Sequence, residues 1–142
     1  ACDTDVAALG ATTIMGNHEM LHRALENVVR NAARHTPSGT RVHVAGTLDA
    51  ARRAIQFTVT DEGPGVAAAE LGSIFEPFYR GSQAKGTAGH GLGLAIARRV
   101  VEAHGGSIRA FNRATGGLAV EIRLPAARSS RDDDALRCVA PR

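Results

Sequence analysis

Hydrophobic and polar positions follow a helical period in one long segment near the start of the chain. In NHEMLHRALENVVRNAARH, residues 17–35, apolar side chains recur at i, i+4, i+7 and i+11: Leu21, Leu25, Val28 and Ala32. Gly16 and Asn17 form a turn and helix-start signal, and Pro37 disfavours helical backbone in the residue before it. We therefore expect one long amphipathic helix between these signals.

Four other segments alternate apolar and polar residues, which is typical of half-buried strands. Short turn sequences, residues 49–51 and 115–117, join these segments in two pairs. The pattern predicts two hairpins, formed by residues 41–48 with 52–61 and by residues 107–113 with 118–125.

A second helix is expected between the hairpins, at about residues 92–104, and Gly105-Gly106 end it. This element order predicts an α+β fold, a two-layer sandwich. Its mixed, mostly antiparallel sheet of about five strands is expected to carry about three helices on one face. Residues 1–125 are expected to form this domain. Residues 126–142 contain mainly Ala, Arg, Ser and Asp without periodicity, so we expect a disordered tail.

The composition is that of a soluble globular domain with an aliphatic core. Of 142 residues, 44% are hydrophobic and only 4% are aromatic, so Val, Leu, Ile and Ala must fill the interior. The net charge of +3 comes from scattered arginines, which argues against nucleic-acid binding. No apolar run is long enough to span a membrane and no export signal is present, so we expect no membrane contact by this chain. Cys2 and Cys138 have no metal-binding spacing and are expected to be free thiols of a reducing compartment.

Glycines crowd the start of the second expected helix, at Gly89, Gly91 and Gly93, although each glycine disfavours a helix by about 1 kcal/mol. Such a cluster is typical of a phosphate chain lying against backbone N–H groups, but a tight loop without a ligand explains it equally well. A dinucleotide-binding fingerprint is excluded because Leu94 stands where its last glycine is required. A P-loop is excluded because residues 87–88 are Thr-Ala in place of Lys and Ser or Thr.

Three further patterns carry candidate chemistry. Asn27, Asn31 and Arg34 share one side of the first helix; an exposed polar face would explain them, but asparagine is a poor helix former. Asp61 follows an apolar strand and opens the sequence DEGPG, which also suits a surface turn. IFEPFYRG, residues 74–81, places apolar residues immediately before the glycine-rich segment.

Taken in order, four motifs resemble the nucleotide-binding boxes of bacterial sensor histidine kinases. They are ENVVRNAARHTP (26–37) as the N box, DEGPG (61–65) as the G1 box, FEPF (75–78) as the F box and GHGLGL (89–94) as the G2 box. Over residues 14–124 the chain is thus similar to the ATP-binding catalytic domain of that family, in the Bergerat-fold superfamily that includes gyrase, Hsp90 and MutL. The N box is most similar to those of proteobacterial envelope-sensing kinases. The resemblance implies a Bergerat fold with ATP and Mg²⁺ as cofactors.

The resemblance also implies a role for each polar residue of the first helix. Asn31 would be the Mg²⁺ ligand, which suits a cation that prefers oxygen. Asn27 would support the water shell of the metal or the phosphates, and Arg34 would pair with the phosphates; these three residues form the implied catalytic set. His35 stands where many relatives have tyrosine and would pack beside the nucleotide. Asp61 would accept a hydrogen bond from the 6-amino group of adenine and disfavour the 6-oxo group of guanine.

A lid between the F box and the G2 box is implied to close over the nucleotide. Phe75 and Phe78 would anchor its near end in the apolar layer, and Leu92 and Leu94 would anchor its far end. The glycines between these anchors would let backbone N–H groups approach the phosphates while the segment hinges.

Further implied nucleotide contacts lie around the base and on the lid. Gly63 and Gly65 would leave room for the base against the backbone. Arg80 and Lys85 are candidate phosphate contacts on the lid. The implied nucleotide-binding set is completed by Val66, Ile74, Phe75, Gly89, His90, Gly91, Leu92, Gly93 and Leu94.

One position separates kinases from ATP-hydrolysing relatives in this resemblance. Those relatives carry a water-activating Glu one turn before the metal-binding Asn, whereas this chain has Asn27, which cannot act as a general base. Glu26 lies about 100° round the helix from Asn27 and is expected to point elsewhere. The chain is therefore expected to hold ATP for transfer of its γ-phosphoryl group to a histidine. NHEML, residues 17–21, lacks the continuation of a phosphoacceptor motif, so that histidine is expected on a dimerisation domain absent from the chain.

This hypothesis names the dimerisation domain of the same kinase and its response regulator as partners, with the chain itself a monomer. It places the chain in the cytoplasmic part of a kinase anchored in the inner membrane. Two alternatives remain: a module that binds nucleotide or docks partners without kinase activity, and an ATPase of the gyrase and Hsp90 type (GHKL). An anti-sigma-factor kinase is disfavoured by the long lid with an F box.

Overall fold

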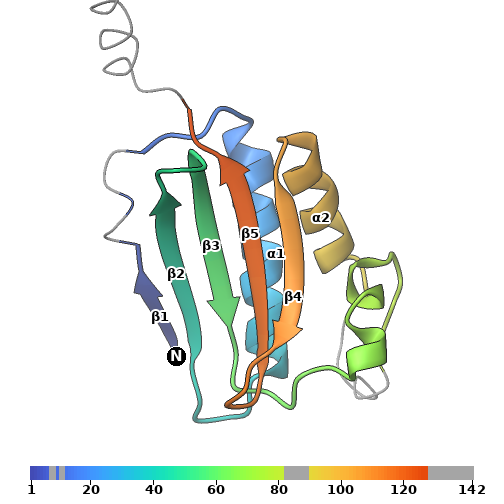
Figure 1. Ribbon diagram of the computed structural model, residues 1–142. Coiled ribbons are helices and arrows are strands. Elements are labelled where there is room, and N and C mark those ends of the chain that lie inside the picture. Colours follow the sequence, from blue (N-terminus) through green and yellow to red (C-terminus); the bar gives the residue numbers. More distant parts are fainter. Residues whose placement is uncertain (7–8, 10–11, 82–89, 128–142) are drawn as a thin grey trace, which may run out of the picture.

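The computed structural model describes residues 1–6, 9, 12–81 and 90–127. Its elements follow one another as a strand, a long helix, a hairpin, two short 3-10 helices, a second helix and a second hairpin (Figure 1). The expected helices and strands are all present, and their ends differ from expectation by at most two residues. The bounds are β1 Cys2–Asp5, α1 His18–His35, β2 Val42–Asp49, β3 Ala54–Thr60, η2 Ala68–Glu70, η3 Ser73–Phe75, α2 Gly93–Ala103, β4 Ser107–Asn112 and β5 Leu118–Pro125.

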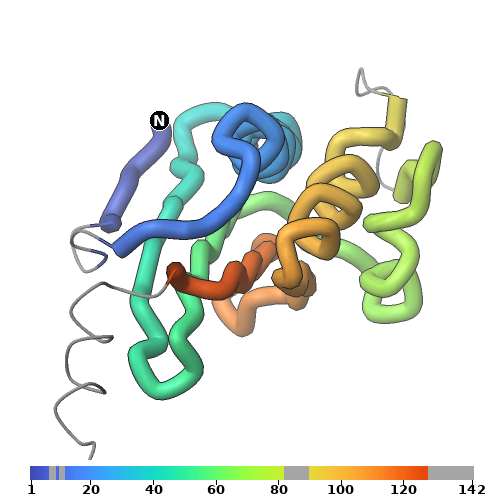
Figure 2. The backbone as a smooth tube through the Cα atoms, turned by 90° about the horizontal axis from the view of Figure 1, so that it is seen from above, coloured from blue at the N-terminus to red at the C-terminus, as the bar shows by residue number. Residues whose placement is uncertain are grey.

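The five strands form one sheet in the order β1-β2-β3-β5-β4. β1 pairs with β2 in parallel, and the other three pairs are antiparallel. Helices α1 and α2 cover one face of this sheet, and the segment with η2 and η3 lies beside α2 (Figures 1 and 2). The predicted two-layer α+β fold is therefore confirmed, with two α-helices and two single-turn 3-10 helices in the described part of the chain.

Strand β1 could not be expected from the hydrophobic pattern. Its four residues, CDTD, are all exposed and contain no alternating apolar side chains. The strand forms by backbone pairing with β2, in a register that places Cys2 opposite Val42 and Asp5 opposite Ala45. The thiol of Cys2 is free and exposed. Cys138 lies outside the described residues.

Helix α1 begins and ends where side chains satisfy its terminal backbone groups. Asn17 Oδ1 accepts a hydrogen bond from the N–H of Met20 at 3.0 Å, which caps the first turn. At the other end, the N–H and the hydroxyl of Thr36 donate to the carbonyl of Ala32 at 3.0 and 2.8 Å. The N–H of Asn17 also donates to Nε2 of His104 at 3.1 Å, so the start of α1 is joined to the end of α2.

The apolar core lies between the sheet and the two helices. Leu21 and Leu25, which the periodicity places on the core face of α1, are only partly buried. The core side of α1 therefore centres on Ala24 and Val28. The polar stripe, which consists of Asn27, Asn31 and Arg34, lies at the edge of that side. None of the described helices is long and apolar enough to cross a membrane. The buried cluster consists of Ala24, Val28, Ala32, Val42, Val59, Phe75, Leu94, Ala97, Val100, Val101, Leu118, Val120, Ile122 and Leu124.

Backbone hydrogen bonds continue just past β5. The N–H of Ala126 donates to the carbonyl of Arg53, and the N–H of Ala127 donates to the carbonyl of Thr13, both at 2.8 Å. The domain boundary expected after residue 125 thus lies within two residues of the last described contact. Residues 128–142 of the expected tail lie outside the described residues.

Candidate functional site

Two asparagines lie one turn apart on α1, and the first of them, Asn27, lies beside the start of α2. Asn27 and Asn31 are half-buried, and neither amide makes a hydrogen bond within the described residues. Gly93, the first residue of α2, faces Asn27 so closely that a β-carbon on the glycine would lie 3.9 Å from Asn27 Oδ1. No buried side-chain polar atom of the described residues lacks a partner, so these amide atoms are open to solvent and free to bind an external ligand.

The first turn of α2 offers hydrogen-bond donors next to these amides. Leu92 occupies the N-cap position and supplies no side-chain hydrogen bond to the helix. The first N–H groups of a helix without such a cap are free for other acceptors, and the helix dipole favours anions there. Leu94 is buried in the core and anchors the helix behind this turn. The start of α2 and Asn27 together therefore suit a phosphate chain with its cation.

The predicted stripe continues to the last turn of α1, where Arg34 is exposed and His35 is half-buried. The backbone of His35 also meets the loop after β3. A β-carbon on Gly63 would lie 2.5 Å from the carbonyl oxygen of His35, so only glycine permits this approach. The approach brings Asp61 and the end of α1 to the same side of the fold.

Asp61 is a buried carboxylate with an exposed fraction of 3%. Its Oδ1 atom accepts hydrogen bonds from the N–H groups of Gly63 at 2.8 Å and of Leu118 at 3.1 Å. These bonds fix the side chain between the loop after β3 and the first residue of β5. Because both bonds end on Oδ1, Oδ2 is the oxygen that could accept from a bound molecule.

Two residues of the second hairpin hold the backbone of the loop that contains Asp61, and the sequence motifs did not identify them. The side chain of Asn112 makes two hydrogen bonds with the backbone of Val66: Oδ1 accepts from the N–H of Val66 at 2.9 Å, and Nδ2 donates to its carbonyl at 2.6 Å. Arg113 donates from Nη1 to the backbone carbonyl of Asp61 at 2.8 Å. The only local signal was a polar end of a strand before a glycine turn, which is common in hairpins without any site.

The two ends of the predicted lid meet at its base. The N–H of Phe78 donates to the carbonyl of Gly91 at 2.9 Å. Gly91 has φ +67°, and a β-carbon there would lie 2.6 Å from the carbonyl oxygen of Tyr79. This glycine is therefore required by the closure of the loop itself, whatever the ligand. Burial and the carboxylate of Glu70, which accepts a hydrogen bond from the phenol, raise the pKa of Tyr79.

Of four residues predicted to contact the nucleotide from the lid, the structure describes two. Arg80 and His90, at the two ends of the lid, are exposed. Lys85 and Gly89 lie outside the described residues. The nucleotide contacts that the resemblance implies for all four stay predictions.

The expectation that Phe78 anchors the lid in the apolar layer is wrong. Phe78 is 73% exposed and has φ +64°, a left-handed conformation that is unusual for an aromatic residue. Its backbone bond to Gly91 holds the chain in this conformation and leaves the ring outside the core. Phe75 is 7% exposed and does lie in the core, with Ile74 packed against it.

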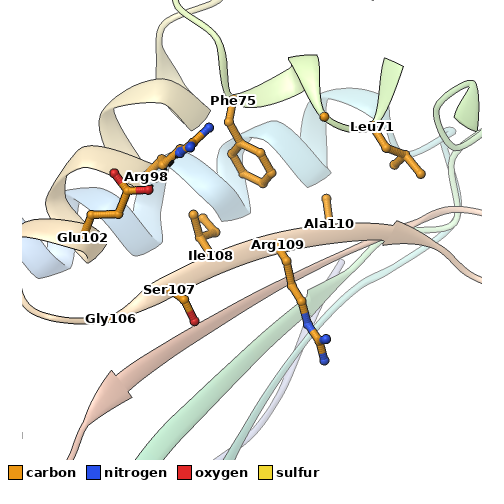
Figure 3. Close-up of a pocket in the computed structure, with 10 residues that line it drawn as sticks. Leu71, Phe75, Arg98, Glu102, Gly106, Ser107, Ile108, Arg109 and Ala110 are labelled. Carbon is orange, nitrogen blue, oxygen red and sulfur yellow. Dashed lines mark hydrogen bonds and ion pairs between the residues drawn. The ribbon is translucent and has the colours of Figure 1, made fainter. Parts of the chain in front are cut away.

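One described hollow is lined by residues other than the two asparagines and Asp61. It has a volume of about 390 Å³ between η2, η3, α2 and β4, and Figure 3 shows the ring of Phe75 pointing into it. Its polar groups are already paired: Arg98 Nε lies 2.9 Å from Glu102, and Arg109 Nε lies 2.7 Å from Glu121. These hydrogen bonds raise the pKa of both arginines. The hollow thus offers few free polar groups to orient a polar ligand.

The chain is similar in sequence to proteins of one family. A family model described as histidine kinase-, DNA gyrase B-, and HSP90-like ATPase matches residues 16–128. The sensor histidine kinase CpxA of Escherichia coli is 41% identical over 118 residues, which cover 82% of this chain and 25% of CpxA. The sensor-like histidine kinase SenX3 of Mycobacterium tuberculosis is 36% identical over 123 residues, which cover 85% of this chain and 30% of SenX3. The chain thus spans less than a third of either relative.

Solved structures have the same fold. The mycobacterial sensor histidine kinase MprB superposes with a TM-score of 0.81 at 34% identity, covering 90% of this chain and 84% of that one. Full-length ShkA in complex with AMPPNP superposes with a TM-score of 0.75 at 29% identity, covering 90% of this chain and 26% of that one. The latter protein binds an ATP analogue.

Substitution of two adjacent glycines in the second hairpin tests the close contact between Gly117 and the backbone of Asp61. Gly116 and Gly117 have φ of +91° and +89°, so alanine strains either position by about 1–2 kcal/mol. Only at Gly117 would the new β-carbon also overlap the carbonyl oxygen of Asp61, whereas nothing lies within 4 Å at Gly116. We expect Gly117→Ala to destabilise the fold by about 2–3 kcal/mol more than Gly116→Ala, measured by urea unfolding. Equal losses in the two variants would contradict the contact.

Proposed function

The chain belongs to the family of histidine kinase-, DNA gyrase B- and HSP90-like ATPases, and we propose that it binds ATP with Mg²⁺ and donates the γ-phosphoryl group to a histidine of a partner domain. The single observation that carries this proposal is the solvent-open amide of Asn27 beside the uncapped start of α2, with the amide of Asn31 one turn along α1. Amide oxygens and helix N–H groups are the donors and acceptors that a cation and a phosphate chain require.

In this proposal the adenine base of ATP lies at Asp61. An ionised carboxylate only accepts hydrogen bonds, so Oδ2 pairs with the 6-amino group of adenine and repels the 6-oxo group of guanine. Because Asp61 is buried, an unpaired acceptor opposite guanine costs about 1–3 kcal/mol or more, which favours ATP. Gly63, Gly65 and Val66 form the adjacent loop, and Asn112 holds that loop against β4.

In the same proposal the phosphates of ATP lie between α1 and the start of α2. Asn31 supplies an oxygen ligand to Mg²⁺ without adding negative charge, and Asn27 supports the water shell or the phosphates from one turn earlier. When bound, the cation neutralises charge on the phosphate chain. Arg34 and Arg80 provide charge partners for the same oxygens. Gly91 and Gly93 keep the backbone beside them free of side chains.

The site favours transfer of the phosphoryl group over hydrolysis. Asn27 occupies the position from which a general base would act, and Glu26 forms an ion pair with Arg30 on the exposed side of α1. Water therefore lacks an activating carboxylate. In transfer, a nitrogen of the acceptor imidazole forms a bond to the γ-phosphorus, the bond from that phosphorus to the β,γ-bridging oxygen breaks, and ADP leaves. Positioning and charge neutralisation lower the barrier.

The partners follow from this reaction. The acceptor histidine lies on a dimerisation domain of the same kinase, and a response regulator then receives the phosphoryl group. The chain acts in the cytoplasmic part of a kinase anchored in the inner membrane. The competing functions, nucleotide binding without transfer and ATP hydrolysis, differ in what becomes of the γ-phosphate.

Replacing the proposed metal ligand tests the phosphate side of the site. We expect Asn31→Ala to abolish Mg²⁺-dependent ATP binding in titration calorimetry and to leave the circular dichroism spectrum unchanged, because Asn31 lies outside the core cluster. Glu26→Ala is the matched control, since its side chain pairs with Arg30 and faces away from the stripe. Unchanged affinity in Asn31→Ala, or equal loss in the control, would refute the assignment.

The fate of labelled ATP tests the reaction. Incubated with [γ-³²P]ATP, the chain alone should release phosphate very slowly and carry no stable label. Addition of the dimerisation domain from its own parent kinase should transfer the label to a histidine of that domain. Rapid phosphate release by the chain alone would favour an ATPase, and binding without transfer to that domain would favour a binding module.

A further inference from the structure

The nucleotide site leaves one motif of the first helix unused. Residues 18–22 read His-Glu-Met-Leu-His, and they form the first turns of α1. Imidazoles four residues apart lie on one face of a helix, the spacing with which helices present two histidines to a metal ion. The rings of His18 and His22 are stacked, with centroids 6.2 Å apart and planes inclined by 18°, and both side chains are exposed.

We propose that His18 and His22 form a binding site for a divalent transition-metal ion such as Zn²⁺. Two nitrogens that each lie about 2.1 Å from a tetrahedral ion are about 3.4 Å apart. The 6.2 Å between the ring centroids is a distance between ring centres, and binding requires these exposed side chains to rotate so that one nitrogen of each ring points to the ion. Water occupies the remaining positions of the ion. Imidazole suits Zn²⁺, Ni²⁺ and Cu²⁺, whereas Mg²⁺ prefers oxygen, so this site and the proposed ATP site select different ions.

The described surroundings support metal binding and supply no further ligand for a hydrolytic centre. Glu19, which stands where such a motif carries its catalytic carboxylate, forms an ion pair with Arg23 at 2.8 Å. Both ring nitrogens of His104 are engaged, Nε2 by the N–H of Asn17 at 3.1 Å and Nδ1 by the carbonyl of Val100 at 2.7 Å. Within the described residues no three His, Cys, Asp or Glu side chains converge. The ion thus has two protein ligands.

The histidine pair, His18 and His22, is separate from the proposed nucleotide contacts on the same helix. Asn27 follows His22 by five residues, which is about 7.5 Å along the helix axis. An ion bound by His18 and His22 links the first and second turns of α1. It therefore stabilises the start of that helix without entering the ATP site.

Titration of the chain with Zn²⁺ in the absence of nucleotide tests this inference. Because the Cys2 thiol is exposed and thiolates bind zinc, all proteins carry Cys2→Ser and Cys138→Ser, and none carries a histidine tag. Near pH 7.5 we expect one equivalent of Zn²⁺ to bind and to raise the melting temperature. Binding should be lost in His18→Asn and in His22→Asn, because each removes one of the two ligands. MgCl₂ should give no such signal.

Two controls separate this result from the proposed function. His43→Asn removes an imidazole on β2, beside Asp3, and should bind zinc like the parent. Asn31→Ala should also keep zinc binding, even where it loses Mg²⁺-ATP. Absence of zinc binding in the parent, or binding that survives in either His18→Asn or His22→Asn, would overturn the inference. Circular dichroism of each variant establishes that the exposed substitutions leave the fold intact.

Discussion

The buried carboxylate of Asp61 is the interaction on which the arrangement of the site depends. Its Oδ1 atom holds the loop after β3 through Gly63 and the start of β5 through Leu118. Its backbone carbonyl accepts a hydrogen bond from Arg113 and lies against Gly117. A carboxylate this deeply buried is unfavourable unless it has such donors. One residue thus connects three segments and gives the proposed base-binding loop its shape before a ligand arrives.

The phosphate side depends on how α1 and α2 are held together. At one end, Gly93 lies against Asn27, so the start of α2 faces the polar stripe. At the other end, the ring of His104 accepts a hydrogen bond from the N–H of Asn17. Buried small side chains in both helices let them pack closely over the sheet. The amides and the helix N-terminus therefore keep a set distance, as electrostatic preorganisation requires.

Much of the fold and part of the site could be predicted from local sequence. Periodicity located both helices and both hairpins, and ordered motifs pointed to Asn27 and Asp61. Three features escaped because they arise from contacts distant in sequence. Strand β1 has no apolar pattern and forms by backbone pairing with β2. Phe78 points outward because its backbone is bonded to Gly91, and Asn112 matters through Val66, which lies 46 residues away.

The most direct test of the account is a crystal structure of the chain with Mg²⁺ and a non-hydrolysable ATP analogue. The account predicts that the 6-amino group of adenine lies within hydrogen-bond distance of Asp61 Oδ2. It also predicts that Asn31 Oδ1 coordinates the cation and that the phosphates lie at the start of α2. A nucleotide bound in the hollow beside Phe75 and β4, or a base that makes no contact with Asp61, would contradict it.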